Sequence, residues 1–185
     1  DKPVDKPVDK NSKLLPPTAN WLIYPKVIMG GYPDPRSNYA KNLVELGVTR
    51  FISLMEEDES KKFFEYESQS TNTAKILNKT IYFYRFPIKD RSVANDSDVI
   101  SFINNLYDMI SKSKEDEIFF IHCYGGHGRT GTIASLLYAK WYNNKDPKEV
   151  IKAVRKLHKE RVKKYTKSHQ KAVQTNSQEK QITRL

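Results

Sequence analysis

The feature that most constrains the fold of this chain is a short apolar run followed at once by a glycine-rich loop and a second apolar stretch. The run Ile118–Ile121 contains no polar residue, which is typical of a strand buried on both faces of a sheet. Residues 130–142 are apolar on almost every side, and this pattern predicts a helix packed against the sheet. Strands and helices alternate elsewhere too, so we predict an α/β fold with a central, largely parallel sheet of four to five strands flanked by helices.

The other elements are predicted from clusters of β-branched and aromatic residues and from residues that begin or end helices. Further strands are expected at residues 21–24, 27–29, 49–55 and 80–86. Further helices are expected at about residues 38–46, 60–69, 96–112, 147–157 and 168–182. Ser37 is expected to cap the first of these helices and Gly47 to end it. Asn95 or Asp96 is expected to cap the third helix, and Asp146 the fourth.

The chain divides into a tail and one folded domain. The sequence Asp-Lys-Pro-Val occurs twice within residues 1–13. Proline at every fourth position with alternating charge cannot build a hydrophobic core. We therefore expect a disordered, charged tail at residues 1–13 and a single domain at residues 14–185.

Membrane and compartment signals are few. No apolar run approaches the ~20 residues that a membrane helix needs, and the N-terminus lacks the apolar stretch of a signal peptide. Because the sequence does not start with Met, we expect it to begin within a longer chain or after processing. A single cysteine excludes an intramolecular disulfide framework. It favours a reducing compartment, the cytoplasm, with the nucleus as the alternative.

Charge is unevenly distributed along the chain, whose formal net charge is +10. Residues 145–171 contain 11 Lys or Arg against 3 Asp or Glu, a net +8. Residues 56–67 carry six acids against two lysines, a net −4. A solvated helix face explains the basic segment, and peripheral contact with an anionic membrane is the alternative. No nucleic-acid partner is expected, since the basic segment lacks interleaved aromatic residues and a known binding module.

The loop between the two apolar segments has the composition of an anion-binding site. It reads His122-Cys123-Tyr124-Gly125-Gly126-His127-Gly128-Arg129-Thr130-Gly131. A helix N-terminus leaves backbone N–H groups unpaired, and glycines let the loop curl so that these groups converge on one anion. Arg129 can add a fork of hydrogen bonds to a phosphate, and the same positive field favours the thiolate of Cys123. We expect Cys123 to attack phosphorus and form a phosphocysteine intermediate; a buried structural cysteine is the alternative.

These residues identify a family. The pattern His-Cys-x-x-Gly-x-x-Arg-Thr-Gly resembles the signature of the protein tyrosine phosphatase superfamily, and the chain resembles a small, atypical dual-specificity-type member. The resemblance implies that Cys123 is the nucleophile, that Arg129 clamps the phosphate, and that the backbone of residues 124–129 cradles it. It also implies that Thr130 hydrogen-bonds Cys123 and helps it leave. His122 is expected to order the loop and tune the thiolate, unless it is only a core histidine.

A general acid is needed to protonate the leaving oxygen, a proton transfer that contributes typically ~10²–10⁴-fold. The segment Arg85-Phe86-Pro87-Ile88-Lys89-Asp90 ends a predicted strand 33 positions before Cys123. Members of the family keep their aspartic acid at a similar place, so Asp90 is the predicted acid. Asp96 and Asp98 are rivals, but helix capping explains either of them more simply.

A glutamine motif near the C-terminus gives a further candidate. The segment Gln174-Thr175-Asn176-Ser177-Gln178 resembles the loop that positions the hydrolytic water in larger tyrosine phosphatases. Gln178 is therefore a candidate supporting residue. A helix start capped by Thr175 or Ser177 is the alternative.

Two classes of substrate are compatible with the sequence. The extra recognition loop of larger phosphotyrosine enzymes is not found, so the resemblance implies a dual-specificity enzyme acting on phosphotyrosine or phosphoserine/threonine in proteins. His127 stands where the phosphoinositide-phosphatase branch carries a lysine, and a protonated His127 would contact a second phosphate. A phosphoinositide or inositol-polyphosphate phosphatase is therefore the alternative. A rhodanese-like sulfurtransferase or a phosphate-binding pseudoenzyme represents a different class. Neither a metal nor another cofactor is expected, because no residues have metal-ligand spacing, and the oligomeric state is not predicted.

Overall fold

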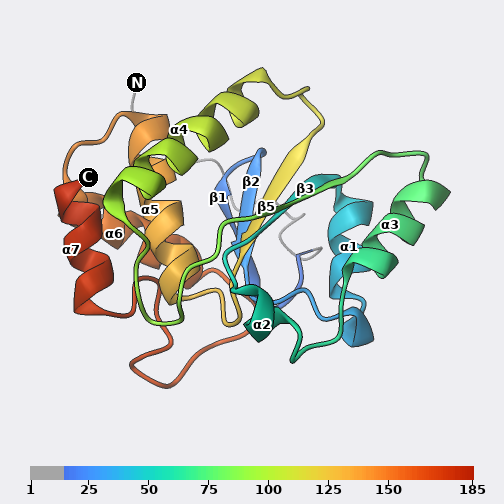
Figure 1. Cartoon of the computed structure of the whole chain (residues 1–185), viewed down its shortest axis with the longest axis horizontal. Helices are drawn as coiled ribbons and strands as arrows, with labels where there is room; N and C mark the ends of the chain where they lie inside the picture. The colour runs from blue at the N-terminus through green and yellow to red at the C-terminus, as the bar shows by residue number, and fades with distance from the viewer. Residues whose placement is uncertain (1–14) are drawn as a thin grey trace.

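The computed structural model describes residues 15–185, so the tail expected at residues 1–13 lies outside the described residues. Five strands form one sheet: β1 (Ala19–Ile23), β2 (Val27–Gly30), β3 (Val48–Ser53), β4 (Tyr82–Arg85) and β5 (Ile118–His122). The helices are η2 (Pro35–Ser37), α1 (Tyr39–Leu46), α2 (Glu57–Ser60), α3 (Glu67–Ile76), α4 (Asp96–Lys112), α5 (Gly128–Tyr142), α6 (Pro147–His158) and α7 (Asn176–Arg184). Figure 1 shows α1 and α3 on one face of the sheet and α4 to α7 on the other. The predicted α/β architecture is confirmed.

The sheet directs several loops to one edge. Its strand order is β1-β2-β5-β3-β4, and every neighbouring pair except β1 and β2 is parallel. In the register of the parallel strands, His122 pairs with both Gly30 and Ser53, and Ser53 pairs with Arg85. The loops that follow β2, β3, β4 and β5 therefore leave the sheet side by side, which is where α/β proteins place their ligands.

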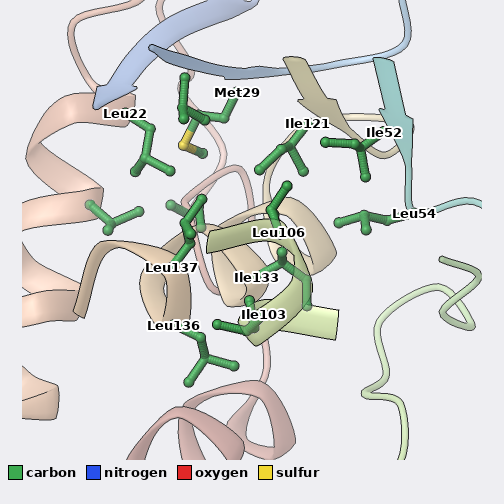
Figure 2. Close-up of a cluster of buried hydrophobic side chains, with 14 of the residues drawn as sticks. Leu22, Met29, Ile52, Leu54, Ile103, Leu106, Ile121, Ile133, Leu136 and Leu137 are labelled. Carbon is green, nitrogen blue, oxygen red and sulfur yellow. The ribbon is translucent and has the colours of Figure 1, made fainter. Parts of the chain in front are cut away.

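The apolar residues of β5 divide between two cores. Phe119 and Ile121 face the core beneath α4 and α5, whereas Ile118 and Phe120 face the core beneath α1. This alternation follows from the two-residue period of a strand. Figure 2 shows strand residues of the first core, among them Ile121, meeting side chains of α4 and α5. Burial on both faces fixes β5 and so the point at which the loop after it begins.

The predicted helix boundaries are partly confirmed. Gly47 ends α1 at φ +119°, and the side chains of Asn95 and Asp146 cap α4 and α6. The prediction that Ser37 caps α1 is wrong, because Ser37 belongs to η2 and the cap position is Asn38. The hydroxyl of Ser37 instead donates to the carbonyl of Asp34.

Two predicted helices are wrong in extent. The helix expected at residues 60–69 is split, because α2 ends at Ser60 and α3 begins only at Glu67. The helix expected at residues 168–182 begins at Asn176, after an irregular segment in which Val173 has φ +61°. A β-branched residue rarely adopts this backbone conformation, so tertiary contacts override the local helical pattern here.

Candidate active site

The loops at the carboxyl-terminal edge of the sheet enclose a cavity of about 590 Å³ at the junction of β5 and α5. Most of the predicted site residues line this cavity: Asp90, Cys123, Tyr124, Gly125, His127, Gly128 and Arg129. The remaining ones do not: His122, Gly126, Thr130 and Gln178. The structure thus brings the predicted nucleophile, clamp and acid to one cavity from two loops that lie apart in the sequence.

The loop after β5 fits closely against the end of β2. Gly126 has φ +73°, and a Cβ atom at this position would lie only 2.4 Å from the carbonyl carbon of Gly30. Only glycine meets both conditions. The backbone N–H of Tyr32 also donates to the carbonyl of Tyr124, at 2.8 Å. The curled loop shape predicted from its glycines is therefore held by the neighbouring strand.

His122 fixes the entry to the loop from inside the core. It is fully buried, and its Nδ1 lies 3.1 Å from the carbonyl oxygen of Cys123. Burial lowers the pKa of His122 to about 4, so the ring is neutral at pH 7. A carbonyl oxygen only accepts, so Nδ1 carries the proton and Nε2 accepts from the hydroxyl of Tyr66 at 2.7 Å. These contacts support a role in ordering the loop, and tuning of the thiolate stays a prediction.

Arg129 is buried and held by a carboxylate that the sequence did not reveal. Its Nη1 and Nη2 donate to the two carboxylate oxygens of Glu59, both at 2.7 Å, and Nη1 also donates to the carbonyl of Ile88 at 3.0 Å. Burial disfavours ionised Glu59, but the hydrogen bonds and charge of Arg129 outweigh burial and lower the pKa of Glu59. The backbone N–H of Glu56 donates to the same carboxylate. Glu59 thus fixes the guanidinium from behind.

One donor of Arg129 is left without a protein partner. Nε is buried and makes no hydrogen bond to any of the residues 15–185. A buried donor without a partner costs about 1–3 kcal/mol, more for a charged group, so native structures rarely retain one without a reason. Nε and the adjacent Nη2 form the second fork of a guanidinium, the geometry that binds two oxygens of a phosphate.

Asp90 lies beside this fork. Its Oδ1 is 3.3 Å from Nη2 of Arg129, and its side chain is 67% exposed. The rivals Asp96 and Asp98 do not line the cavity, and Asp96, the first residue of α4, pairs with Arg184 of α7 at 2.9 Å. Hydrogen bonds from Arg184 and Gln181 lower the pKa of Asp96 to about 2. Asp90 is the predicted acid that reaches the cavity, and its role in proton transfer stays a prediction.

The hydrogen bond expected between Thr130 and Cys123 is not formed. The Thr130 hydroxyl is fully buried and has no hydrogen-bond partner among residues 15–185. Hydroxyls elsewhere in α5, such as that of Thr132, donate to the carbonyl four residues earlier. For Thr130 this would be the carbonyl of Gly126, which accepts from Arg161 instead. The structure therefore corrects this expected contact.

Gln178 is a capping residue and does not line the cavity. Its Oε1 accepts from the backbone N–H groups of Gln174 and Thr175, and its Nε2 donates to the carbonyl of Ser92. The alternative of a helix start capped by Thr175 is therefore confirmed. Gln174, the first glutamine of the same motif, lines the cavity next to Gly128. The candidate for positioning water is Gln174, which sequence reasoning passed over although it belongs to the quoted motif.

His127 does not carry the charge expected for binding a second phosphate. It is 8% exposed, and its Nδ1 lies 2.8 Å from Nε2 of His158. Burial, followed by the nearby charge of Arg161, lowers the pKa of His127 to about 4. The ring is therefore neutral at pH 7, which corrects the expectation of a protonated His127.

Three aromatic side chains form one wall of the cavity, and of these only Tyr124 was predicted from the sequence, as part of the phosphate-binding loop. This aromatic wall consists of Tyr32, Phe63 and Tyr124. The rings of Phe63 and Tyr124 stack with centroids 4.9 Å apart, and Tyr32 lies 5.2 Å from Phe63. The Tyr32 hydroxyl donates to the carbonyl of Phe64 and so holds the segment between α2 and α3 in place. No local motif marks this wall, because its members come from three separate loops.

Residues 15–185 lack two features, a membrane-spanning helix and a cluster of metal-binding side chains. No helix in this part of the chain combines the length and hydropathy needed to cross a membrane. Within the same residues, no three His, Cys, Asp or Glu side chains are grouped so that they would hold a metal ion.

A buried cysteine at the start of a glycine-rich loop, with an arginine at the end of that loop and a parallel sheet behind it, defines the protein tyrosine phosphatase fold and site. The chain belongs to this superfamily, in its atypical dual-specificity branch. Residues 16–182 match the family model described as "Swiss Army Knife protein, DSP-PTPase phosphatase domain".

Two viral proteins are similar in sequence. Protein 197R of Invertebrate iridescent virus 6, named a tyrosine phosphatase, is 37% identical over 122 residues, which make up 65% of this chain and 41% of that protein. Protein 067L of Invertebrate iridescent virus 3, also named a tyrosine phosphatase, is 28% identical over 144 residues, 77% of this chain and 54% of that protein. The chain spans about half the length of these curated relatives.

Solved structures share the fold at low sequence identity. The active form of Tk-PTP has a TM-score of 0.68 at 17% identity, covering 91% of this chain and 95% of that chain. PTPMT1 in complex with PI(5)P has a TM-score of 0.65 at 16% identity, covering 90% and 92%. Kinase associated phosphatase has a TM-score of 0.61 at 17% identity, covering 84% and 83%. These similarities support the fold.

Proposed function

We propose that this chain hydrolyses phosphotyrosine in proteins through a phosphocysteine intermediate, in the cytoplasm. The observation that carries the proposal is the buried Nε of Arg129, which has no partner among the described residues and lies next to an Nη2 that Glu59 holds in place. Arg50 also has a buried Nε without a partner, but Arg50 does not line the cavity, whereas Arg129 does. A sulfurtransferase or a structural cysteine would have no use for this fork and for Asp90 beside it.

In the first step, the thiolate of Cys123 attacks phosphorus while Arg129 and the loop N–H groups hold the phosphate oxygens. The bond between phosphorus and the ester oxygen breaks as the bond to Sγ forms. Asp90 gives its proton to the departing oxygen, so that the product leaves as a neutral alcohol or phenol. The positive N-terminus of α5 stabilises the charge that builds up on the phosphoryl oxygens.

In the second step, water attacks the phosphorus of phosphocysteine. Asp90, now ionised, takes the proton of this water, and the bond between phosphorus and Sγ breaks to restore the thiolate and release phosphate. Gln174 lines the cavity next to Gly128 and is placed to orient the water.

The aromatic wall favours phosphotyrosine over phosphoserine or phosphothreonine. A phosphotyrosine ring that enters the cavity would pack on Phe63 and Tyr124, and an aromatic pair adds about 0.5–1.5 kcal/mol beyond area burial. Phosphoserine and phosphothreonine have no ring to place there. The wall thus gives this small domain a means of recognising the phenyl ring without the additional loop of larger enzymes.

A phosphoinositide substrate is the second candidate. It is favoured by Arg91 and Lys163, which line the same cavity. Neither cation forms an ion pair with a carboxylate within residues 15–185, so both are free to meet a second phosphate. The neutral state of His127 argues against this candidate, because the sequence argument for a second phosphate required a protonated His127.

The proposal is tested with matched peptides bearing phosphotyrosine or phosphothreonine and with soluble phosphoinositides. We expect the highest kcat/KM for the phosphotyrosine peptide. Phe63→Ala should reduce that value about tenfold and leave the phosphothreonine peptide nearly unaffected, whereas Phe64→Ala is the control because Phe64 does not line the cavity. A higher kcat/KM for phosphoinositides, or equal losses for both peptides in Phe63→Ala, would overturn the assignment of the substrate.

A further inference from the structure

Behind the loop that follows β5 lies a second buried arginine, Arg161, which does not touch the cavity. It is 1% exposed. Its Nη2 donates to the carbonyl of Gly126 at 2.7 Å, and its Nε donates to Oδ1 of Asn20 on β1 at 2.8 Å. Its Nη1 is 3.2 Å from the hydroxyl of Tyr165 and 3.5 Å from the carbonyl of Gly125.

All of these partners are neutral. Within residues 15–185, no carboxylate forms an ion pair with Arg161, although Arg129 in the same site has Glu59. A buried charge without a counterion is costly, and proteins normally pair it or remove it. The basic segment around Arg161 was read from the sequence as a solvated face, yet this member of the segment is among the most buried side chains in the protein.

The charge of Arg161 affects titratable groups in and next to the loop. After burial, it is the largest cause of the lowered pKa values of His127 and His158, which lie on the loop and on α6. Its hydrogen bonds to the carbonyls of Gly126, at 2.7 Å, and Gly125, at 3.5 Å, hold these oxygens toward Arg161, which does not line the cavity. A peptide unit whose carbonyl is held outward directs its N–H the other way.

We propose that Arg161 is a positioning residue whose missing counterion is the phosphate of the substrate. It acts through the loop: it holds two carbonyls outward and adds a buried positive charge that a bound phosphate compensates. The inference rests on the proposed phosphatase function. It predicts that giving Arg161 a permanent carboxylate partner inside the protein will weaken phosphate binding.

Asn20→Asp supplies that partner in an almost isosteric change, since Oδ1 of Asn20 already accepts from Arg161. Binding of inorganic phosphate is measured by calorimetry, alongside the melting temperature. We expect Asn20→Asp to raise the Kd for phosphate on the order of tenfold, because a unit charge buried beside Arg161 acts at an effective dielectric constant of about 20, well below that of water. Because this charge is buried, the increase in Kd should depend less on salt concentration than the effect of a surface charge would.

Two controls separate charge from structure. Asn20→Ala removes both hydrogen bonds of this side chain, the one from Arg161 and the one to the carbonyl of Trp21, without adding charge. It should change the Kd less than Asn20→Asp does. Asn104→Asp adds the same charge beside Lys140, outside the cavity, and should leave the Kd unchanged.

The outcomes distinguish this inference from the proposed function. If the wild type hydrolyses phosphotyrosine peptides but Asn20→Asp binds phosphate as tightly as Asn20→Ala, the inference is wrong and the function stands. If the wild type neither binds phosphate nor hydrolyses any phosphoester, both fail. Should Asn20→Asp not fold, Arg161→Lys and Arg161→Met replace it: the lysine, which keeps the charge, should bind phosphate at least several-fold more tightly than the methionine.

Discussion

The N–H groups of Arg129 fall into two sets: one bonds to the protein and fixes the guanidinium, and the other is proposed to bind the phosphate of the substrate. Nη1 donates hydrogen bonds to Glu59 and to the carbonyl of Ile88, and Nη2 donates one to Glu59. The buried Nε has no hydrogen-bond partner among the described residues. Because the guanidinium is already fixed, little side-chain entropy is lost when phosphate binds. Asp90, the proposed proton donor to the leaving oxygen, lies beside the same Nη2, with its Oδ1 3.3 Å away.

The role of Asp90 is tested by leaving-group dependence. Asp90→Asn keeps the shape of the side chain but carries no transferable proton. We expect kcat to fall about 10²–10⁴-fold for an alkyl phosphate and much less for p-nitrophenyl phosphate, whose leaving group needs no proton. The measurement is kcat for both substrates at a single pH. Equal losses on the two substrates would speak against Asp90 as the acid.

The role of Glu59 is tested by removing its charge. Glu59→Gln retains one acceptor for Arg129 and loses the bidentate, charged pair. We expect kcat/KM for a phosphotyrosine peptide to fall roughly tenfold or more, because the guanidinium is then free to leave its place. Glu57→Gln is the matched control, since Glu57 is exposed and makes only a 3.9 Å ion pair with Lys61. A Glu59→Gln variant with unchanged kcat/KM contradicts the role.

The segment between α6 and α7 is the part of the secondary structure that the sequence predicts least well. Its composition predicts a helix, but Arg155 donates to the carbonyls of Ala172 and Val173, and the N–H of Val173 donates to His127. These long-range bonds hold Val173 at φ +61° and delay α7 to Asn176. The strands, in contrast, were found close to their true positions because each carries its own apolar pattern.

The residues of the site also fall into those that the sequence predicted and those that it did not. Cys123 and Arg129 were predicted because they share one loop with a local signature, and Asp90 because members of the family keep their aspartic acid at a similar place after a strand. Glu59 and Arg161 were not found, because each acts only through a partner far away in the sequence, 70 and 35 positions respectively. The alternative role of His127 required a protonated ring, and burial together with the charge of Arg161, which the sequence does not place nearby, lowers its pKa to about 4.

The start of α7 offers a prediction at this scale. Thr175 caps the helix by accepting from the N–H of Gln178, so Thr175→Ala should lower the free energy of unfolding by about 1 kcal/mol. For a chain of this length the melting temperature should fall by about 2–4 °C. Calorimetric scans of this variant and of Thr183→Ala, an exposed position in the same helix, provide the comparison. A Thr175→Ala variant that melts no lower than Thr183→Ala would contradict the capping role.

At the scale of the whole molecule, buried neutral histidines couple stability to pH. The pKa is lowered to about 4 for His122 and His127 and to about 2 for His158, in each case chiefly by burial. An unfolded histidine has a pKa of about 6.5, so between these values the unfolded chain binds more protons and stability rises with pH. The contribution is complete above about pH 6.5 and is lost progressively as the pH falls below it.

Denaturant unfolding from pH 7 to pH 5 should therefore show a free energy of unfolding that declines on acidification. Each such histidine contributes up to about 1.4 kcal/mol per pH unit once the unfolded chain is protonated. His158→Gln should flatten this slope, whatever its effect on stability at pH 7. The same substitution at the exposed His169 is the matched control. A slope that is unchanged in His158→Gln would disprove the coupling.

The sheet brings the proposed nucleophile, clamp and acid to one edge. The most direct test of the mechanism is whether the phosphoryl group becomes covalently bound to Cys123 during turnover. Wild-type protein is mixed with a phosphotyrosine peptide, quenched within milliseconds and analysed by mass spectrometry, with Cys123→Ser as the control. We predict a phosphate adduct on Cys123 in the wild type, and neither adduct nor turnover in Cys123→Ser. Turnover without an adduct on Cys123, or hydrolysis by Cys123→Ser at a comparable rate, would contradict the proposed mechanism.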